Sequence, residues 1–244
     1  MDIPLPPWRQ PSPTRARAAR PPLTRDQIVR AALRIVAAEG LDAVSMRRVA
    51  AEFDTGASSL YAHVANKDEL YQLMFDEICR DIPIPAPDPA RWQEQIKELA
   101  RSGYEAMVRH GDVAKAAMAQ IPTGPHAMRV SDAMFGLLLG AGMDPTKAGW
   151  ALDRIFLYIV ADAYENSLYL QRFGDSPERV HEYFVEFTGQ LRDYYESLPA
   201  SHYPHLRAHG EALTSGDGRQ RFEFGLDMLV DGLARLIPAA PASE

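Results

Sequence analysis

The spacing of apolar residues constrains the fold of this chain most. Between residues 23 and 237 they recur at three- and four-residue intervals, as in the run Ile28, Ala31, Ala32 and Ile35. This spacing places them on one face of a helix, and the alternation typical of strands is absent throughout. The sequence therefore predicts an all-α fold.

Proline and glycine divide the chain. Residues 1–22 hold seven prolines and four arginines and cannot bury a core, so we expect a mobile arm. The proline-rich run at 83–89 would end a helix firmly and is the expected domain boundary. We expect an arm at 1–22, a helix-turn-helix domain with a linker helix at 23–82, a helical effector-binding and dimerisation domain at 83–238 and a tail at 239–244.

Capping residues predict where the helices begin. A capping box at Thr24–Gln27 starts the first helix near residue 25, and Gly40 supplies a left-handed stop. Ser45 caps a short second helix, a third covers 57–63, and a second capping box at Asn66–Glu69 opens the linker helix. Later helices are expected at about 89–110, 112–120, 125–141, 144–173, 177–198 and 218–237, with 199–217 as a loop.

Charge and composition restrict the class of protein. The net charge is −7, yet residues 1–67 hold ten basic and six acidic side chains, so a basic end is joined to an acidic body that DNA would repel. No apolar run is long enough to span a bilayer and no apolar signal core is present, which predicts a cytoplasmic protein without a membrane partner. The single cysteine, Cys79, excludes a disulfide framework and a cysteine-based zinc site, and no cofactor is expected.

Residues 45–63 have the spacing of a helix-turn-helix, with Asp54-Thr55-Gly56 as the turn. The second helix of such a unit enters the major groove, so its exposed side chains must be short or polar. Leu60 and Val64 would face inward. The candidate DNA-binding residues, reaching base edges or phosphates, are Arg47, Arg48, Thr55, Ala57, Ser58, Ser59, Tyr61, His63 and Lys67.

The stretch 23–70 resembles the N-terminal domain of the tetracycline-repressor (TetR) family. The residues that carry the resemblance are Ile28–Ala32, Glu39–Leu41, Met46–Ala50, Ser58–Val64 and Asn66–Leu70. The segments Arg221–Leu226 and Leu229–Leu233 resemble the last helix of the tetracycline-repressor subgroup. The resemblance implies a ligand-responsive transcriptional repressor that binds a palindromic operator as a homodimer, with recognition helices about 34–36 Å apart.

In this family the last long helices of two subunits form a four-helix bundle. The sequence supports such a dimer independently, because the helix from Pro145 is apolar nearly all round, which leaves one face without a place inside a single subunit. Gly225 and Gly232, seven residues apart in the last helix, would allow close approach. The alternative is a core that lies wholly within one chain.

The resemblance also implies that a ligand in the sensor domain shifts the linker helix and changes the spacing of the two DNA-binding units. A pocket between the linker helix and the sensor helices should be adaptable and largely apolar, for an apolar or aromatic effector. The candidate pocket residues, each also a candidate for ordinary core packing, are Met74, Tyr104, Met107, His110, Met118, Met134, Phe135, Phe156, Tyr164, Glu165 and Tyr169.

His110 and Glu165 lie roughly where the tetracycline repressor holds its drug–magnesium ligand. The His pair that this repressor carries at the end of the linker helix is replaced here by Arg80–Pro83, so we expect an effector other than tetracycline. His110 is alternatively a histidine at a helix end, where a cation interacts well with the helix dipole. His202, His205 and His209 are spaced like a metal site but lie in the expected loop, which favours a gate over a metal centre.

Two other classes of function are an enzyme and a constitutive DNA-binding or scaffolding dimer. The sequence has no nucleophile elbow, glycine-rich phosphate loop or metalloprotease helix, so we do not expect an enzyme. A constitutive DNA-binding or scaffolding dimer would have a filled sensor core without a cavity. The sequence does not distinguish an activator from a repressor.

Overall fold

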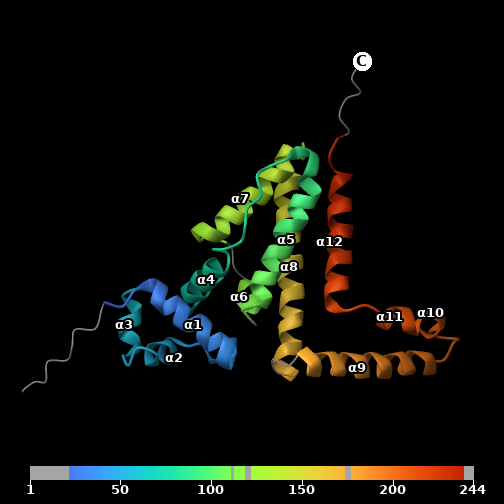
Figure 1. The fold of residues 1–244 in the computed structure, drawn as a ribbon, viewed down its shortest axis with the longest axis horizontal. Coiled ribbons are helices and arrows are strands. Elements are labelled where there is room, and N and C mark those ends of the chain that lie inside the picture. The colour runs from blue at the N-terminus through green and yellow to red at the C-terminus, as the bar shows by residue number, and fades with distance from the viewer. Residues whose placement is uncertain (1–21, 111–112, 119–121, 174–176, 239–244) are drawn as a thin grey trace, which may run out of the picture.

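The computed structural model describes residues 22–110, 113–118, 122–173 and 177–238, and the expected tail and nearly all of the expected arm lie outside these ranges. Every regular element within them is helical, as the apolar spacing predicted. A bundle formed by α1 (Arg25–Glu39), α2 (Met46–Ala51), α3 (Ala57–Tyr61) and α4 (Lys67–Ile78) lies at one end of the molecule (Figure 1). Within the described residues, no helix is both long and apolar enough to cross a membrane.

The N-terminal helices begin where their capping residues predict. Thr24 accepts a hydrogen bond from the Gln27 amide while the Gln27 side chain accepts one from the Thr24 amide, so the predicted capping box is confirmed. The Ser45 hydroxyl accepts a hydrogen bond from the third residue of α2 in the same way. The core of this domain consists of fully buried side chains from all four helices, including Ile28, Ile35, Val49, Leu60 and Leu70.

The second layer contains α5 (Trp92–Val108), α6 (Val113–Ala117), α7 (Pro125–Gly140) and α8 (Pro145–Phe173), with a 3-10 turn, η3 (Pro89–Arg91), before α5. The 29-residue α8 packs along α5 and also contacts α6 and α7. Asp144 caps α8, because its carboxylate accepts hydrogen bonds from the amides of Thr146 and Lys147. α4 contacts both α6 and α7, so it belongs to the N-terminal bundle and to the larger domain at once.

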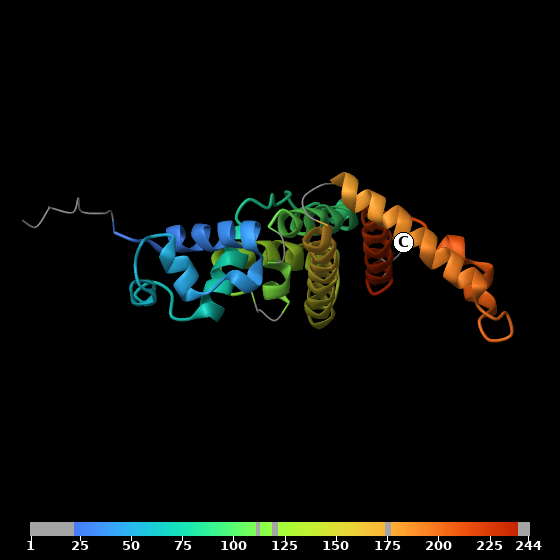
Figure 2. The same cartoon turned by 90° about the horizontal axis from the view of Figure 1, so that it is seen from below.

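Three of the four C-terminal helices extend away from the body of the molecule, and the last one returns to it. α9 (Pro177–Ser197) runs away from the end of α8, α10 (Pro204–Ala208) and α11 (Gly210–Thr214) lie on α9, and α12 (Gly218–Ala234) returns to α5 and α8 (Figures 1 and 2). Among its described side chains α9 has none that is buried. We call α9, α10 and α11 the arm helices.

Three local predictions were wrong. Segment 199–217 is not a loop, because α10 and α11 form there and pack on α9. Gly40 has a positive φ of 82°, but its ψ of 167° is extended, so it ends α1 outside the left-handed helical region. Gly225 does not leave room for a second subunit, because a Cβ there would lie 2.4 Å from the hydroxyl oxygen of Tyr158 in the same chain.

The apolar surface of α8 is also largely buried within its own chain. Ile155, Ile159 and Val160 are buried, and Phe156 is half-buried. Trp150 remains 67% exposed near the start of the helix. Most of the apolar side chains of α8 that suggested a dimer interface therefore belong to the core of the single chain.

Candidate DNA-binding unit and ligand cavity

The turn between α2 and α3 differs from the expected glycine turn. Its left-handed residue is Asp54, with φ 48°, whereas Gly56 is the N-cap of α3 and has an ordinary φ of −84°. The Thr55 and Ser59 hydroxyls are hydrogen-bonded at 2.8 Å, and the Thr55 amide donates to the carbonyl of Ala50. These contacts fix the direction in which α3 leaves α2.

The candidate DNA-binding side chains gather on the exposed side of this unit. Arg47, Ser58, Ser59, Tyr61 and Lys67 are exposed, whereas Thr55, Ala57 and His63 are half-buried. Tyr61 is 53% exposed, while Leu60 next to it is fully buried and Val64 nearly so, as the inward assignment predicted. α3 thus presents small and polar groups outward and holds its position through leucine and valine.

Arg48 is engaged inside its own domain. Its guanidinium pairs with Glu39 and with Glu52, each at 2.6 Å. Hydrogen bonds to these carboxylates raise the pKa of Arg48, and the reciprocal bond lowers the pKa of Glu39. Arg47 lacks these contacts and is the more available cation of the two.

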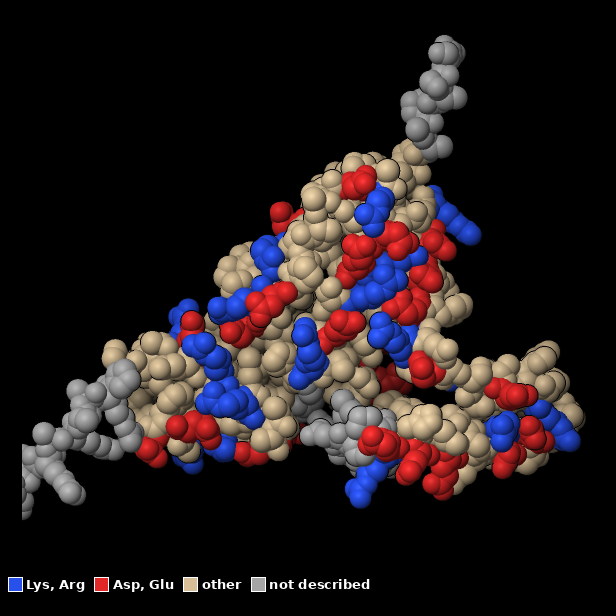
Figure 3. All heavy atoms as spheres, in the orientation of Figure 1, with Lys and Arg blue, Asp and Glu red and all other residues tan. Residues whose placement is uncertain are grey.

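Most of the excess positive charge of residues 1–67 belongs to the first 21 residues of the chain. Residues 22–67 hold six basic and five acidic side chains, so most of the basic excess of residues 1–67 lies outside the described residues. In the view of Figure 3, acidic and basic groups intermix over this domain instead of forming one basic surface. The folded domain therefore contributes few cations for phosphates.

Arg25 is a positioning residue that the sequence analysis did not identify. Its Nε donates a hydrogen bond of 3.1 Å to the carbonyl of His63, just after α3 ends, and its guanidinium lies 3.8 Å from Glu69. It therefore links the starts of α1 and α4 to the end of α3. A basic residue directly after a helix N-cap gives no local sign of a contact 38 residues away.

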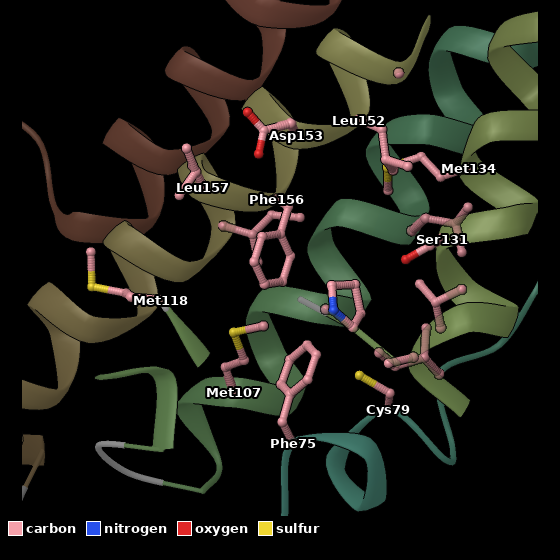
Figure 4. Close-up of a pocket in the computed structure, with 18 residues that line it drawn as sticks. Phe75, Cys79, Met107, Met118, Ser131, Met134, Leu152, Asp153, Phe156 and Leu157 are labelled. Carbon is pink, nitrogen blue, oxygen red and sulfur yellow. The ribbon is translucent and has the colours of Figure 1, made fainter. Parts of the chain in front are cut away.

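A cavity of about 450 Å³ lies between α4, α5, α7 and α8 (Figure 4). Its wall is mainly apolar, and Phe75 from α4 meets Phe156 from α8 edge-on with ring centroids 5.8 Å apart. Ser131 and Asp153 contribute polar side chains. The residues that line the cavity are Phe75, Cys79, Ile82, Leu99, Gly103, Met107, Met118, Pro122, Ala127, Val130, Ser131, Met134, Gly149, Leu152, Asp153, Phe156, Leu157 and Ile159.

Four of the candidate pocket residues line this cavity: Met107, Met118, Met134 and Phe156. The other seven do not: Met74, Tyr104, His110, Phe135, Tyr164, Glu165 and Tyr169. Met74 is fully buried in the core, Tyr104 stacks on Phe222 of α12 at 4.2 Å, and Tyr169 packs on Phe184 of α9.

The difference along α8 has a geometric cause. The cavity uses residues 149–159, whereas Glu165 and Tyr169 lie 9 and 13 residues beyond Phe156, about 14 and 20 Å along a helix that rises 1.5 Å per residue. Some of the cavity residues that were not predicted could have been found from the sequence. The helical spacing places Ala127, Val130 and Ser131 on the same face as Met134, which was predicted.

Cys79 is part of the apolar wall and is buried. Burial, with a smaller contribution from Asp76, raises the pKa of its thiol to about 12, and Arg129 opposes this weakly. The sulfur is therefore a neutral thiol that acts as a wall atom.

The histidines do not converge. Burial lowers the pKa of His110, with Arg109 acting in the same direction and Glu77 opposing, so the ring favours its neutral form over the imidazolium that would interact with a helix dipole. His205 belongs to α10, and His202 is hydrogen-bonded to Ser201. Within the described ranges, no three His, Cys, Asp or Glu side chains are placed to hold a metal ion.

Similarities to known proteins cover nearly the whole chain. Residues 28–74 match the family described as "Bacterial regulatory proteins, tetR family", and residues 84–237 match "Tetracyclin repressor-like, C-terminal domain". The HTH-type transcriptional repressor DrrR1 of Streptomyces coeruleorubidus is 33% identical over 224 residues, which cover 91% of this chain and 81% of that protein. The class G tetracycline repressor protein of Vibrio anguillarum is 27% identical, with 91% and 99% covered.

A solved structure extends the similarity to the fold and to a ligand complex. The TetR family protein ActR of Streptomyces coelicolor, in complex with actinorhodin, is 39% identical, with a TM-score of 0.80 over 91% of this chain and all of that one. The two curated relatives are named as a transcriptional repressor and a tetracycline repressor. The chain belongs to the tetR family of bacterial regulatory proteins: it is a ligand-responsive transcriptional repressor with an N-terminal DNA-binding domain and a tetracyclin repressor-like C-terminal domain.

Proposed function

We propose that the protein binds a palindromic operator as a homodimer and releases it when an apolar or aromatic effector occupies the cavity between α4, α5, α7 and α8. The observation that carries this proposal is the position of the cavity. Phe75, on the helix that also packs in the DNA-binding domain, forms part of its wall. A ligand there would contact the linker helix directly.

The cavity wall defines the class of effector. A volume of about 450 Å³ is within the usual range for a small-molecule site, and aromatic and methionine side chains suit a flat apolar ligand. Ser131 could accept a hydrogen bond from a ligand hydroxyl, whereas the Asp153 carboxylate already pairs with Arg154. A hydroxylated aromatic ring system fits this combination, and the complex of the related ActR with actinorhodin supports a small-molecule effector.

Tetracycline is disfavoured by the same wall. At the end of the linker helix, where the resemblance would place a histidine pair, Arg80 pairs with Glu77 and Ile82 lines the cavity. Neither group offers an imidazole, and an arginine held by a carboxylate is not available to a drug. The effector would bind through shape and aromatic contact.

Exposed apolar side chains support the dimer. Trp150 of α8 and Phe224 and Met228 of α12 are 67%, 71% and 61% exposed, which is unusual for side chains of this size. The unburied α9 points away from its own chain. A second copy packed on α8 and α12 would cover these residues, and the proposed site of action is the cytoplasm, where the operator lies.

Ligand binding can be tested by titrating the purified protein with actinorhodin and with dihydroxyanthraquinone, following tryptophan fluorescence. Ser131→Leu should fill part of the cavity and lower the affinity about five- to 150-fold, because overpacking of a ligand against the added side chain costs about 1–3 kcal/mol. Tyr164→Phe is the matched control, since Tyr164 does not line the cavity. Equal affinities for wild type and Ser131→Leu would place the ligand elsewhere.

DNA binding can be tested with a genomic fragment that the wild-type protein selects. Arg47→Ala and Tyr61→Ala should each weaken binding at fixed salt by about 1–3 kcal/mol if they contact bases, without changing the oligomeric state. Arg91→Ala removes an exposed cation from the sensor domain and serves as the control. A monomeric protein, or unchanged affinity in both variants, would contradict the proposed operator complex.

A further inference from the structure

The linker helix α4 and the sensor helix α7 are joined by two polar contacts that run in opposite directions. Asp76, near the end of α4, is only 7% exposed. Its Oδ1 accepts hydrogen bonds of 2.9 Å from the amides of His126 and Ala127. These amides belong to the first turn of α7, where backbone N–H groups have no partner within the helix. A side chain of α4 thus caps α7. Its negative charge adds to this interaction, because a carboxylate is favourable at a helix N-terminus.

The second contact returns from α7 to the end of α4. Arg129 donates from Nη2 to the carbonyl oxygens of Cys79, Arg80 and Ile82, at 3.3, 3.0 and 2.9 Å. The last carbonyls of a helix have no partner within the helix, and a cation is favourable at this end. Each helix therefore supplies the cap of the other.

Gly124 makes the first contact possible. It is the N-cap of α7, and a Cβ at this position would lie 2.2 Å from both Cγ and Oδ1 of Asp76. Its φ of −76° and ψ of 152° are available to any residue, so the backbone conformation does not require glycine. The close approach of the Asp76 carboxylate does.

Both contacts lie directly behind the wall of the cavity, which Asp76 and Arg129 do not themselves line. Phe75, Cys79 and Ile82 line it from the α4 side, directly beside Asp76 and at two of the carbonyls that Arg129 binds. On the α7 side, Ala127 donates its amide to Asp76 while its side chain faces the cavity. A ligand that displaces either wall must move the two helices through these bonds.

We propose that Asp76 and Arg129 are the positioning residues that couple the cavity to the linker helix, so that they set how strongly effector binding changes DNA affinity. This inference rests on the proposed function of the cavity. The hydrophobic effect is not directional, so apolar contact alone specifies the register of α4 against α7 less sharply than hydrogen bonds do. The reciprocal caps fix the two helix ends in one register, and a ligand therefore moves them as a unit.

The experiment measures a coupling ratio: the dissociation constant for the selected DNA fragment with saturating dihydroxyanthraquinone, divided by the constant without it. In the wild type we expect a ratio of about 5 to 150, the usual range of such coupling. Asp76→Asn, Arg129→Lys and Gly124→Ala should each lower the ratio by about threefold or more, toward one. Gly124→Ala removes neither charge and displaces Asp76 by contact alone.

Met128→Gln is the matched control, because Met128 lies between the capped and capping residues of α7 but is 49% exposed. Its ratio should equal that of the wild type. Loss of stability alone would raise both dissociation constants by the same factor and leave their ratio unchanged. The ratio therefore distinguishes a loss of coupling from a loss of folded protein. If Asp76→Asn fails to fold, Arg129→Lys and Gly124→Ala still decide the question.

Two negative results differ in meaning. If the folded variants bind dihydroxyanthraquinone as the wild type does and keep its full ratio, the two caps do not carry the coupling and the inference is overturned. If the wild type does not bind this probe with an affinity that Ser131→Leu lowers, the cavity assignment fails, and the inference falls with it.

Discussion

Gly225 of α12 offers a quantitative test of how this helix packs on α8. Tyr158 approaches it so closely that an added Cβ would lie 2.4 Å from Oη and 2.8 Å from Cζ. The Tyr158 hydroxyl also donates a hydrogen bond of 2.8 Å to the carbonyl of Phe222, one turn earlier in α12. Gly225→Ala must therefore push the ring away and disturb this bond.

The contributions can be compared. Overpacking a filled contact costs about 1–3 kcal/mol, and a disrupted hydrogen bond adds roughly 0.5–1.5 kcal/mol. Replacing glycine by alanine inside a helix returns about 0.5–1 kcal/mol. The free energy of unfolding should thus fall by about 0.5–4 kcal/mol in Gly225→Ala. Tyr158→Phe removes the nearest atom, so the same substitution should cost less in that background.

The assay is urea unfolding followed by circular dichroism at one protein concentration, since the stability of a dimer depends on concentration. Gly136→Ala is the matched control, because a Cβ at this exposed position of α7 would meet no atom within 4 Å. It should stabilise the protein by about 0.5–1 kcal/mol. If Gly225→Ala were as stable as Gly136→Ala, the close contact between α8 and α12 would be refuted.

Three further predictions concern the other groups described above. Lys67→Met should lower the slope of log affinity against log salt by about one, measured by anisotropy on the selected DNA, if this exposed lysine contacts a phosphate; an unchanged slope would contradict that contact. Burial raises the pKa of Cys79 to about 12, so the neutral thiol should stabilise the folded protein below about pH 9, and this stabilisation should be lost between pH 9 and 12. Cys79→Ala should therefore flatten the decline in the free energy of unfolding at alkaline pH, measured by urea unfolding. Burial lowers the pKa of His110, so the contribution of this residue to the free energy of unfolding is present above pH 6.5 and is lost as the pH falls further. His110→Asn should reduce the loss of stability in acid, and an identical acid profile would argue against a buried ring.

The parts of the fold that could be predicted are those set by residues close together in the sequence. The capping box at Thr24 and the cap at Asp144 act within a few residues, and the structure has both. At Asn66 only half of the expected box forms, because the Glu69 side chain accepts from the Ala65 amide. The helix α12 begins with a complete capping box, Asp217 to Gln220, which follows the pattern of Thr24 and could have been recognised. α10 and α11 could not, because five residues are too few for an apolar period and these helices form by packing on α9.

The site depended on contacts that are distant in sequence. The spacing of apolar residues correctly indicated which face of α3 is inward, and Leu60 is fully buried. It could not indicate how far along α8 the cavity extends, because this depends on where α5 and α7 cross that helix. Likewise, the contacts of Arg48 with Glu39 and of Asp76 with the start of α7 join different helices and leave no periodic trace.

The arm helices have a consequence for the amount of protein in the cell. α9 extends over 21 residues without a buried described side chain, and helices in proteins owe most of their stability to packing. In the proposed dimer, the second copy would supply that packing. Dilution should then melt α9 as the copies separate, and a cell with few copies would hold a less structured regulator. Expression level would thereby set how much of this protein is competent to occupy its operator.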